Sequence, residues 1–277
     1  MRNLREIVDR AAARLGSSPT ARRDAELLVM RAAGRDRAWL MTHPEAELTA
    51  SQTADLESWI ARRARHEPLQ YILGEAEFYG LTFRVTPDVL IPRPETEHLV
   101  EAVLERVGQE TAVRICDVGT GSGCIAVALA HGLRRAQVTA LDLSRAALAV
   151  AKGNAERAGV DGRVRFVESD LLRAVRGERF DVVVSNPPYV RDDEVLEAQV
   201  REHEPHAALF AGATGLEVYE RLIPEAHEAL VPGGWLLMEI GHGQRDALAR
   251  LLRSWDGVCF VPDLQGIPRV ALAQRRA

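Results

Sequence analysis

The residues most suited to chemistry form the run Ser185-Asn186-Pro187-Pro188-Tyr189, which closes an apolar segment that begins at Phe180. Two successive prolines remove two backbone N–H donors and fix two φ angles, so the run predicts a rigid loop that sheet pairing does not require. In such a loop the side chain of Asn186 and the carbonyl of Pro187 can both accept hydrogen bonds from one NH2 group. Tyr189 can then lie flat against a planar substrate. The run therefore predicts a site for a planar NH2 group; a rigid turn without chemistry is the alternative.

A glycine-rich turn follows an earlier apolar run, and it reads Asp117-Val118-Gly119-Thr120-Gly121-Ser122-Gly123-Cys124. Glycines let the backbone turn tightly and let a ligand approach it. A dinucleotide fingerprint would place its third glycine where Cys124 stands, whereas here the glycines fall at alternate positions. Such a turn suits a nucleoside with an amino-acid tail, and Asp117 can accept a hydrogen bond from the ammonium group of that tail, directly or through water. A tight structural turn is the alternative.

Two further carboxylates come at the ends of predicted strands. Asp142 lies 21 residues after Gly121, where a carboxylate can accept hydrogen bonds from both ribose hydroxyls, as in other nucleotide-binding folds. The alternative for Asp142 is a charge at a helix N-terminus beside Ser144. Asp170 ends the next strand and is placed to meet an adenine amino group. Together with the glycine turn, these residues predict a nucleoside site.

Strands and helices alternate from Val113 onward, which positions all of these motifs. Strands are predicted at 113–118, 138–143, 164–168, 180–185, 235–240, 258–261 and 269–273, and helices at 124–133, 145–158, 216–230 and 245–255. Strands separated by helices form parallel βαβ units. The last two strands have no helix between them and suggest a terminal antiparallel pair. The prediction is an α/β fold with a doubly wound, mostly parallel seven-stranded sheet.

The chain is long enough for a larger and a smaller domain. Residues 1–72 show apolar residues at helical spacing, broken at Gly16–Pro19, and predict a small helical domain that serves either packing or substrate recognition. Residues 73–91 predict a linker with a hairpin turning at Gly80. Residues 92–277 form the predicted catalytic domain, which opens with a helix that runs to about Val107.

Charge is distributed unevenly along the chain. Residues 1–72 contain 12 arginines and 10 acidic residues, a net charge of +2. Because the whole chain has a net charge of −5, residues 73–277 carry a net charge of −7. A domain with this acidic balance is poorly suited to gripping duplex phosphates, and no stable binding of nucleic acid is expected. The three cysteines form no CxxC pair, which favours a reducing compartment.

Neither a membrane span nor a metal site is expected. The N-terminus lacks the apolar core of a signal peptide, and no apolar run reaches the roughly 18 residues of a membrane span, so we expect a cytoplasmic protein. His203-Glu204-Pro205-His206 has the wrong spacing for a zinc-binding His-Glu-x-x-His helix, and Pro205 disfavours a continuous helix there.

The motifs together resemble a known family. The Asp-x-Gly-x-Gly-x-Gly turn and the alternating elements resemble class I S-adenosylmethionine-dependent methyltransferases, and Asn-Pro-Pro-Tyr narrows this to enzymes that methylate planar NH2 groups. Further segments narrow it to the HemK/PrmC family of release-factor glutamine methyltransferases, a resemblance that covers nearly the whole chain. These segments are Glu67-Pro68-Leu69-Gln70-Tyr71-Ile72-Leu73-Gly74, Leu90-Ile91-Pro92-Arg93-Pro94-Glu95-Thr96-Glu97, Glu204-Pro205, Ala208-Leu209, Gly215-Leu216 and Tyr219.

This resemblance implies S-adenosylmethionine as the methyl donor. The implied acceptor is the glutamine of the Gly-Gly-Gln loop in class-1 peptide chain release factors. By position, Gly119 to Gly123, Asp142, Leu171 and Asn186 would contact the cofactor, and Asn186 to Tyr189 would hold the glutamine. The position of Leu171 is often aromatic in the family, so a somewhat altered cofactor affinity is expected.

Two other functions fit part of the sequence. A methyltransferase for exocyclic amines of DNA or RNA would use the same Asn-Pro-Pro-Tyr loop, but the acidic catalytic domain and the N-terminal segments argue against it. A non-catalytic protein that binds S-adenosylmethionine would have no need of the intact loop.

Overall fold

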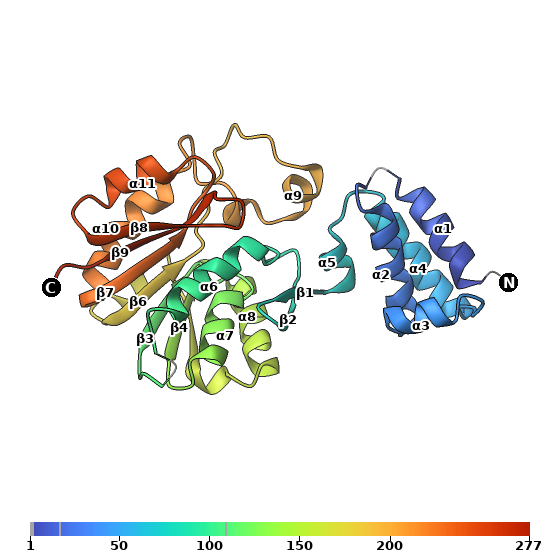
Figure 1. Cartoon of the computed structure of the whole chain (residues 1–277), viewed down its shortest axis with the longest axis horizontal. Helices are drawn as coiled ribbons and strands as arrows, with labels where there is room; N and C mark the ends of the chain where they lie inside the picture. Colours follow the sequence, from blue (N-terminus) through green and yellow to red (C-terminus); the bar gives the residue numbers. More distant parts are fainter. Residues whose placement is uncertain (1–2, 17, 109) are drawn as a thin grey trace. The chain divides into compact units, whose positions relative to one another are not determined.

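The computed structural model describes residues 3–16, 18–108 and 110–277. It divides into two units (Figure 1). Unit 1 comprises Met1–Gly74 together with Leu196–His203, and unit 2 comprises Glu75–Val195 together with Glu204–Ala277. The segment Leu196–His203, which the sequence assigned to the catalytic domain, thus belongs with the N-terminal helices.

Unit 1 is helical, as the spacing of its apolar residues predicted. Its helices are α1 (Leu4–Arg14), α2 (Ala21–Ala33), α3 (Arg37–Thr42), α4 (Ala50–Arg63), α5 (Leu69–Leu73) and α9 (Ala198–His203). Leu4, Leu28 and Leu56 are almost fully buried in one core. A capping box between Thr49 and Gln52 begins α4, because each side chain binds the other residue's backbone N–H.

Arg63, in α4, links α9 to the other helices of unit 1. The Arg63 guanidinium donates to the buried carboxylate of Asp24 at 2.8 Å and to the side-chain oxygen of Gln199 in α9 at 3.2 Å. His203 at the end of α9 contacts the carbonyl of Arg65 at 3.2 Å. The sequence of α9 shows no periodic apolar pattern, in keeping with the fact that none of its residues is buried.

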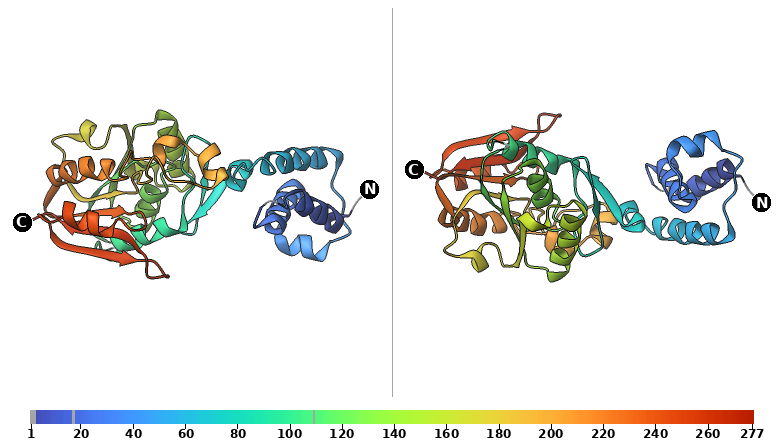
Figure 2. Two further views of the ribbon diagram at one scale, coloured as in Figure 1. Left: turned by 90° about the horizontal axis from the view of Figure 1, so that it is seen from above. Right: turned by 90° about the horizontal axis from the view of Figure 1, so that it is seen from below.

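Unit 2 contains the predicted doubly wound sheet, with the strand order β5-β4-β3-β6-β7-β9-β8. Its strands are β3 (Arg114–Val118), β4 (Gln137–Asp142), β5 (Val164–Glu168), β6 (Phe180–Ser185), β7 (Leu230–Glu239), β8 (Asp256–Pro262) and β9 (Pro268–Gln274). The first five run parallel and the last two pair antiparallel, as predicted. Both views of Figure 2 show β8 and β9 side by side up to the turn that joins them.

Helices cover both faces of this sheet (Figure 1). One core packs α6 (Glu97–Leu104), α7 (Cys124–Gly132) and α8 (Arg145–Arg157) on one face, and a second core packs α10 (Glu217–Ala229) and α11 (Arg245–Leu251) on the other. The central strands are therefore buried on both sides, which explains their continuous apolar runs. A separate hairpin, β1 (Glu75–Phe78) and β2 (Leu81–Arg84), turns at Tyr79 and Gly80, both with positive φ.

Two elements begin several residues away from their predicted starts. The helix expected from residue 92 begins as a 3-10 turn, Pro94–Thr96, and becomes α6 only at Glu97. Pro92 and Pro94 account for this delay, because the residue before a proline is driven toward an extended backbone. β7 begins at Leu230, five residues before the predicted start at Trp235, through an irregular pairing of Leu230 with Phe180.

Candidate active site

The predicted site residues meet at one edge of the sheet. Val118 pairs with Leu141 on one side and with Ser185 on the other, so β3, β4 and β6 end side by side. The glycine turn, Asp142 and the Asn186 loop each leave the sheet at these ends. The strand order reverses at β3, and ligands bind in such crevices at the carboxyl ends of open α/β sheets.

The glycine turn needs its glycines for two different reasons. Gly119, Gly121 and Gly123 all have positive φ, between 54° and 80°. A Cβ on Gly123 would lie 2.9 Å from the Cβ of Ala151, so this glycine lets α7 and α8 pack closely. A Cβ on Gly119 or Gly121 would meet nothing within 4 Å, so the backbone there borders open space that a ligand can fill.

Asp117 is buried beneath this turn, and one of its oxygens has no partner. Its Oδ2 accepts a hydrogen bond from the Thr120 hydroxyl at 2.6 Å and from the Ala126 N–H at 3.2 Å, whereas Oδ1 and the nearby Ser122 hydroxyl lack a hydrogen-bond partner among the described residues. Burial raises the pKa of Asp117 to about 7, and the Thr120 hydrogen bond opposes that shift. Two buried polar atoms without partners fit a polar ligand group, because such atoms are rarely left unsatisfied.

Asp142 ties the glycine turn to the start of α8. Its two oxygens accept hydrogen bonds from the backbone N–H groups of Gly121 and Ser144, each at 2.8 Å. Burial raises the pKa of Asp142, and these two hydrogen bonds oppose the shift. The Ser144 side chain itself caps α8. Each carboxylate oxygen can accept a second hydrogen bond, so Asp142 can still receive ribose hydroxyls.

Asp170 and Leu171 follow β5 on the same side of the sheet. The Asp170 carboxylate accepts two hydrogen bonds from Arg221, at 2.6 and 2.7 Å, and pairs with Arg173 at 3.0 Å. Its predicted contact with adenine remains a prediction. Leu171 has a φ of 51°, which is unusual for a leucine and marks a locally constrained backbone. Leu143, which the sequence did not single out, is 68% exposed beside Asp142.

A buried hydrogen-bond chain lies behind Asn186. Its Nδ2 donates to the Thr96 hydroxyl at 3.1 Å, and that hydroxyl donates to Oε2 of Glu239 at 2.6 Å. The Tyr189 hydroxyl lies 3.4 Å from the other Glu239 oxygen. Thr96 and Glu239 are each 2% exposed. Thr96 thus holds the Asn186 amide and links it to Glu239, which lies 143 residues from Thr96 in the sequence.

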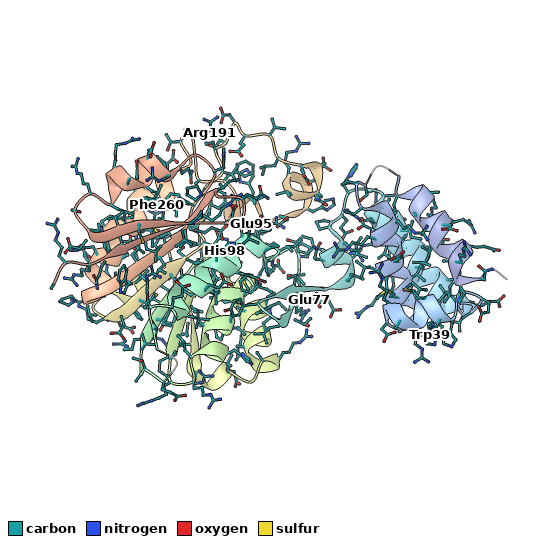
Figure 3. The ribbon with its side chains drawn as sticks, in the orientation of Figure 1. Trp39, Glu77, Glu95, His98, Arg191 and Phe260 are labelled. Atoms are coloured by element: carbon teal, nitrogen blue, oxygen red, sulfur yellow. The ribbon has the colours of Figure 1, made fainter. Side chains whose placement is uncertain are left out.

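Glu239 is the least expected member of this chain. Burial raises its pKa to about 7, while the Thr96 hydrogen bond and Arg269 oppose the shift. Burial also raises the pKa of Tyr189 far above its ordinary value. Glu95, which lies in the same turn as Thr96 and is labelled in Figure 3, adds a further negative charge near Glu239.

The backbone of the Asn186 loop is held by Gln244. Its Nε2 donates to the carbonyls of Tyr189 and Gly215, each at 3.1 Å, and its Oε1 accepts from the Gly241 N–H at 2.9 Å. The sequence singled out neither Glu239 nor Gln244. For Glu239 the available signal was its position as a charged residue at the end of the otherwise apolar strand β7.

In the described ranges, no group of three or more His, Cys, Asp or Glu side chains is placed to hold a metal ion. His203 contacts the Arg65 carbonyl, whereas His206 stacks on Phe210. Among the same residues, no helix is both long and apolar enough to cross a membrane.

Comparison with known proteins gives matches over nearly the whole chain. Residues 6–74 match the PrmC N-terminal domain, and residues 95–259 match the methyltransferase small domain. A release factor glutamine methyltransferase of Koribacter versatilis is 48% identical over 277 residues, with 98% of each chain covered. The enzyme of the same name from Geobacter sulfurreducens is 47% identical, covering 90% of this chain and 88% of its own length.

Similarity to solved structures concerns the fold. A methyltransferase from Pyrococcus furiosus superposes with a TM-score of 0.53 at 17% identity, covering 83% of this chain and 100% of that chain. Its likeness supports the class I methyltransferase architecture of unit 2.

Proposed function

The chain belongs to the family of release factor glutamine methyltransferases, and on this premise we propose how its residues perform the reaction. It is an S-adenosylmethionine-dependent protein glutamine methyltransferase. The methyl acceptor is the side-chain amide nitrogen, N5, of the glutamine in the Gly-Gly-Gln motif of class-1 peptide chain release factors. The observation that carries the proposal is the pairing of β3 with β6, which places the glycine turn and the Asn186 loop at adjacent strand ends.

The cofactor half of the site surrounds the glycine turn. S-adenosylmethionine supplies an electrophilic methyl group on its sulfonium. Asp117 Oδ1, which is buried and has no hydrogen-bond partner among the described residues, would accept a hydrogen bond from the ammonium group, and Gly119–Gly123, which include Thr120 and Ser122, would line the amino-acid tail. Asp142 accepts the ribose hydroxyls. Asp170 and Leu171 lie on the adenine side.

The substrate half is the Asn186–Tyr189 loop. An amide nitrogen is a weak nucleophile because its lone pair is delocalised into the carbonyl. Asn186 Oδ1 and the Pro187 carbonyl accept the two hydrogens of the glutamine NH2 group, while Tyr189 packs against the amide plane. Pro188 keeps the loop rigid. These acceptors orient the nitrogen and stabilise the positive charge that develops on it, so alignment and electrostatic complementarity supply the catalysis.

The reaction needs no strong general base. After methyl transfer the cationic amide nitrogen is acidic enough to lose its proton to water. Asp117 and Glu239, the buried carboxyl groups described above, do not act as bases in this scheme.

The helical domain, residues 1–72, supplies the remote contacts that hold the release factor. Its small positive balance contrasts with the acidic remainder of the chain. Because the catalytic domain is acidic, we expect no stable binding of nucleic acid. We place the reaction in the cytoplasm, where release factors act in translation.

The proposal is tested by offering the enzyme three acceptors with methyl-labelled S-adenosylmethionine: a purified class-1 release factor, total RNA and duplex DNA. We expect label in the release factor alone, and its loss when the motif glutamine is replaced by alanine. Label in RNA or DNA with an unlabelled release factor would overturn the proposal in favour of an exocyclic-amine methyltransferase.

A further inference from the structure

The hydrogen-bond chain behind Asn186 has a defined direction. A carboxylate can only accept hydrogen bonds, and Glu239 accepts one from the Thr96 hydroxyl at 2.6 Å. Thr96 has a single hydroxyl hydrogen, so toward Asn186 it can present only a lone pair. Asn186 must therefore turn its NH2 group toward Thr96, at 3.1 Å.

This direction matters for the substrate. When the Asn186 NH2 group faces Thr96, its Oδ1 faces the opposite way and is free to accept a hydrogen bond. If the amide were reversed, two NH2 groups would meet, one from Asn186 and one from the glutamine. Neither could accept from the other, and the glutamine nitrogen would lose one of its two acceptors.

We propose that Thr96 and Glu239 are positioning residues which select the productive orientation of the Asn186 amide. This inference rests on the proposed function, because it assigns Asn186 Oδ1 to the glutamine NH2 group. Thr96 and Glu239 do not touch the substrate themselves. They act through the direction in which hydrogen bonds run along the chain.

The surroundings of Glu239 suit this role. Both hydrogen bonds to its carboxylate come from hydroxyl groups, those of Thr96 and Tyr189, and its backbone carbonyl accepts from the Tyr219 hydroxyl at 2.8 Å. Among the described residues, Glu95 raises the pKa of Glu239 and Arg269 lowers it, and Arg269 is itself paired with Asp263 at 2.9 Å. Burying a carboxylate without a dedicated cation costs free energy. The hydrogen-bond chain from Asn186 through Thr96 nevertheless requires a group at this position that only accepts hydrogen bonds.

Protonation of Glu239 should remove the selection. A protonated carboxyl group can donate to Thr96, whose hydroxyl hydrogen then turns toward Asn186, and the amide reverses. Burial raises the pKa of Glu239 to about 7, so this change falls within an accessible range. At saturating S-adenosylmethionine and release factor, kcat should therefore decline as the pH falls below about 7.

The experiment measures kcat and KM for the release factor from about pH 5.5 to about pH 9, a range of about 3.5 units that includes the Glu239 pKa. The variants are Thr96→Val, Thr96→Ser, Glu239→Gln and the double variant Thr96→Val/Glu239→Gln. Thr139→Val is the matched control, because Thr139 is also buried and its hydroxyl accepts a hydrogen bond from Arg165 in β5, away from the Asn186 loop. Calorimetry gives the affinity for S-adenosylmethionine, and circular dichroism confirms folding.

We expect Thr96→Val to lower kcat by about 10- to 100-fold while the cofactor affinity stays within about twofold. Thr96→Ser keeps the hydroxyl, so its kcat should stay within about threefold of the wild-type value. The kcat of Thr139→Val should do the same. Glu239→Gln should lower kcat at pH 8 and abolish its decline below pH 7. The double variant should be no slower than Thr96→Val alone, because both residues act in one chain.

A Thr96→Val enzyme with wild-type kcat, or an acid decline that survives in Glu239→Gln, would overturn the inference. Should Thr96→Val fail to fold, the pH profiles of the wild type and Glu239→Gln decide the matter, since a flat wild-type profile also contradicts it. Each variant is compared with the wild type on the acceptor that the wild type methylates. A wild type that leaves the release factor unmodified would instead refute the proposed function.

Discussion

Asp117 and Glu239 are buried carboxyl groups, and burial raises the pKa of each to about 7. Because the pKa of each is higher in the folded than in the unfolded chain, the folded state binds these protons more tightly between about pH 4 and 7. Their ionisation therefore lowers the free energy of unfolding as the pH rises through 7, by roughly 3–4 kcal/mol for each group. In the protein without its ligands, both halves of the site are destabilised at neutral to alkaline pH.

Replacing Asp117 with asparagine tests this reasoning at the residue scale. At pH 8 we expect the ligand-free Asp117→Asn protein to melt roughly 5 °C above the wild type, with the difference shrinking as the pH falls and vanishing below about pH 4, where the wild-type carboxyl group is neutral in both the folded and the unfolded chain. The same variant should bind S-adenosylmethionine at least about tenfold more weakly at pH 8, because an amide lacks the charge that pairs with the ammonium group. Scanning calorimetry and titration calorimetry measure the two effects. A variant that melts below the wild type at pH 8, or binds with undiminished affinity, contradicts the assignment.

Wild-type affinity for the cofactor should itself depend on pH. Below about pH 7 the Asp117 carboxyl group is protonated, and it must lose this proton to pair with the ammonium group. The affinity for S-adenosylmethionine should therefore weaken by up to about tenfold for each pH unit below about 7. Asp117→Asn removes the titrating group and should flatten this dependence.

Among the elements, the close contact of α7 with α8 depends on a single glycine. A Cβ at Gly123 would lie 2.9 Å from the Ala151 Cβ, and the residue also has a φ of 80°. Gly177 is a matched control because its φ is 88° but a Cβ there would meet nothing within 4 Å. We expect Gly123→Ala to cost at least about 2 kcal/mol more than Gly177→Ala and to weaken cofactor binding, since backbone strain is common to both and the clash is not. Equal destabilisation in denaturant titrations would show that the α7–α8 contact is loose.

The elements that the sequence predicted well are those with a strong local signal. Apolar runs located β3, β4 and β6, and the glycines at alternate positions located the turn, because each pattern reflects a local requirement. The start of β7 was missed because Pro232, Gly233 and Gly234 disguise its first half. The helix α9 was missed because it is short and has no buried residue.

The hydrogen-bond partners within the site were beyond prediction for a different reason. Thr96 and Glu239 are 143 residues apart in sequence and meet only because α6 begins near the end of β7. A single sequence contains no spacing rule for such a pair. The Asn186–Tyr189 loop, in contrast, was recognisable because two prolines after a strand have no purpose in sheet pairing.

At the scale of the whole molecule, the two units have separate cores. The helices of unit 1 share one core, and unit 2 has a core on each face of its sheet. A protein lacking residues 1–74 should therefore fold and bind S-adenosylmethionine with unchanged affinity. Its kcat/KM for the release factor should fall by at least about 100-fold, because the remote contacts that align the amide are lost. Its kcat/KM for a short Gly-Gly-Gln peptide should stay the same.

Kinetics on both substrates decide this prediction. The truncated protein keeps α9, whose partner Arg63 is removed, so circular dichroism and calorimetry must first establish folding and cofactor binding. A truncated enzyme that methylates the intact release factor as fast as the full chain would remove the helical domain from substrate recognition.

Peptide mass spectrometry of a class-1 release factor, after incubation with the enzyme and S-adenosylmethionine, tests the central claim most directly. Fragment ions should place one added methyl on the side chain of the Gly-Gly-Gln glutamine. The Asn186→Ala enzyme, which should bind the cofactor nearly as well, should leave that glutamine largely unmodified. A methyl on another residue, an unmodified release factor, or full methylation by Asn186→Ala would contradict the account.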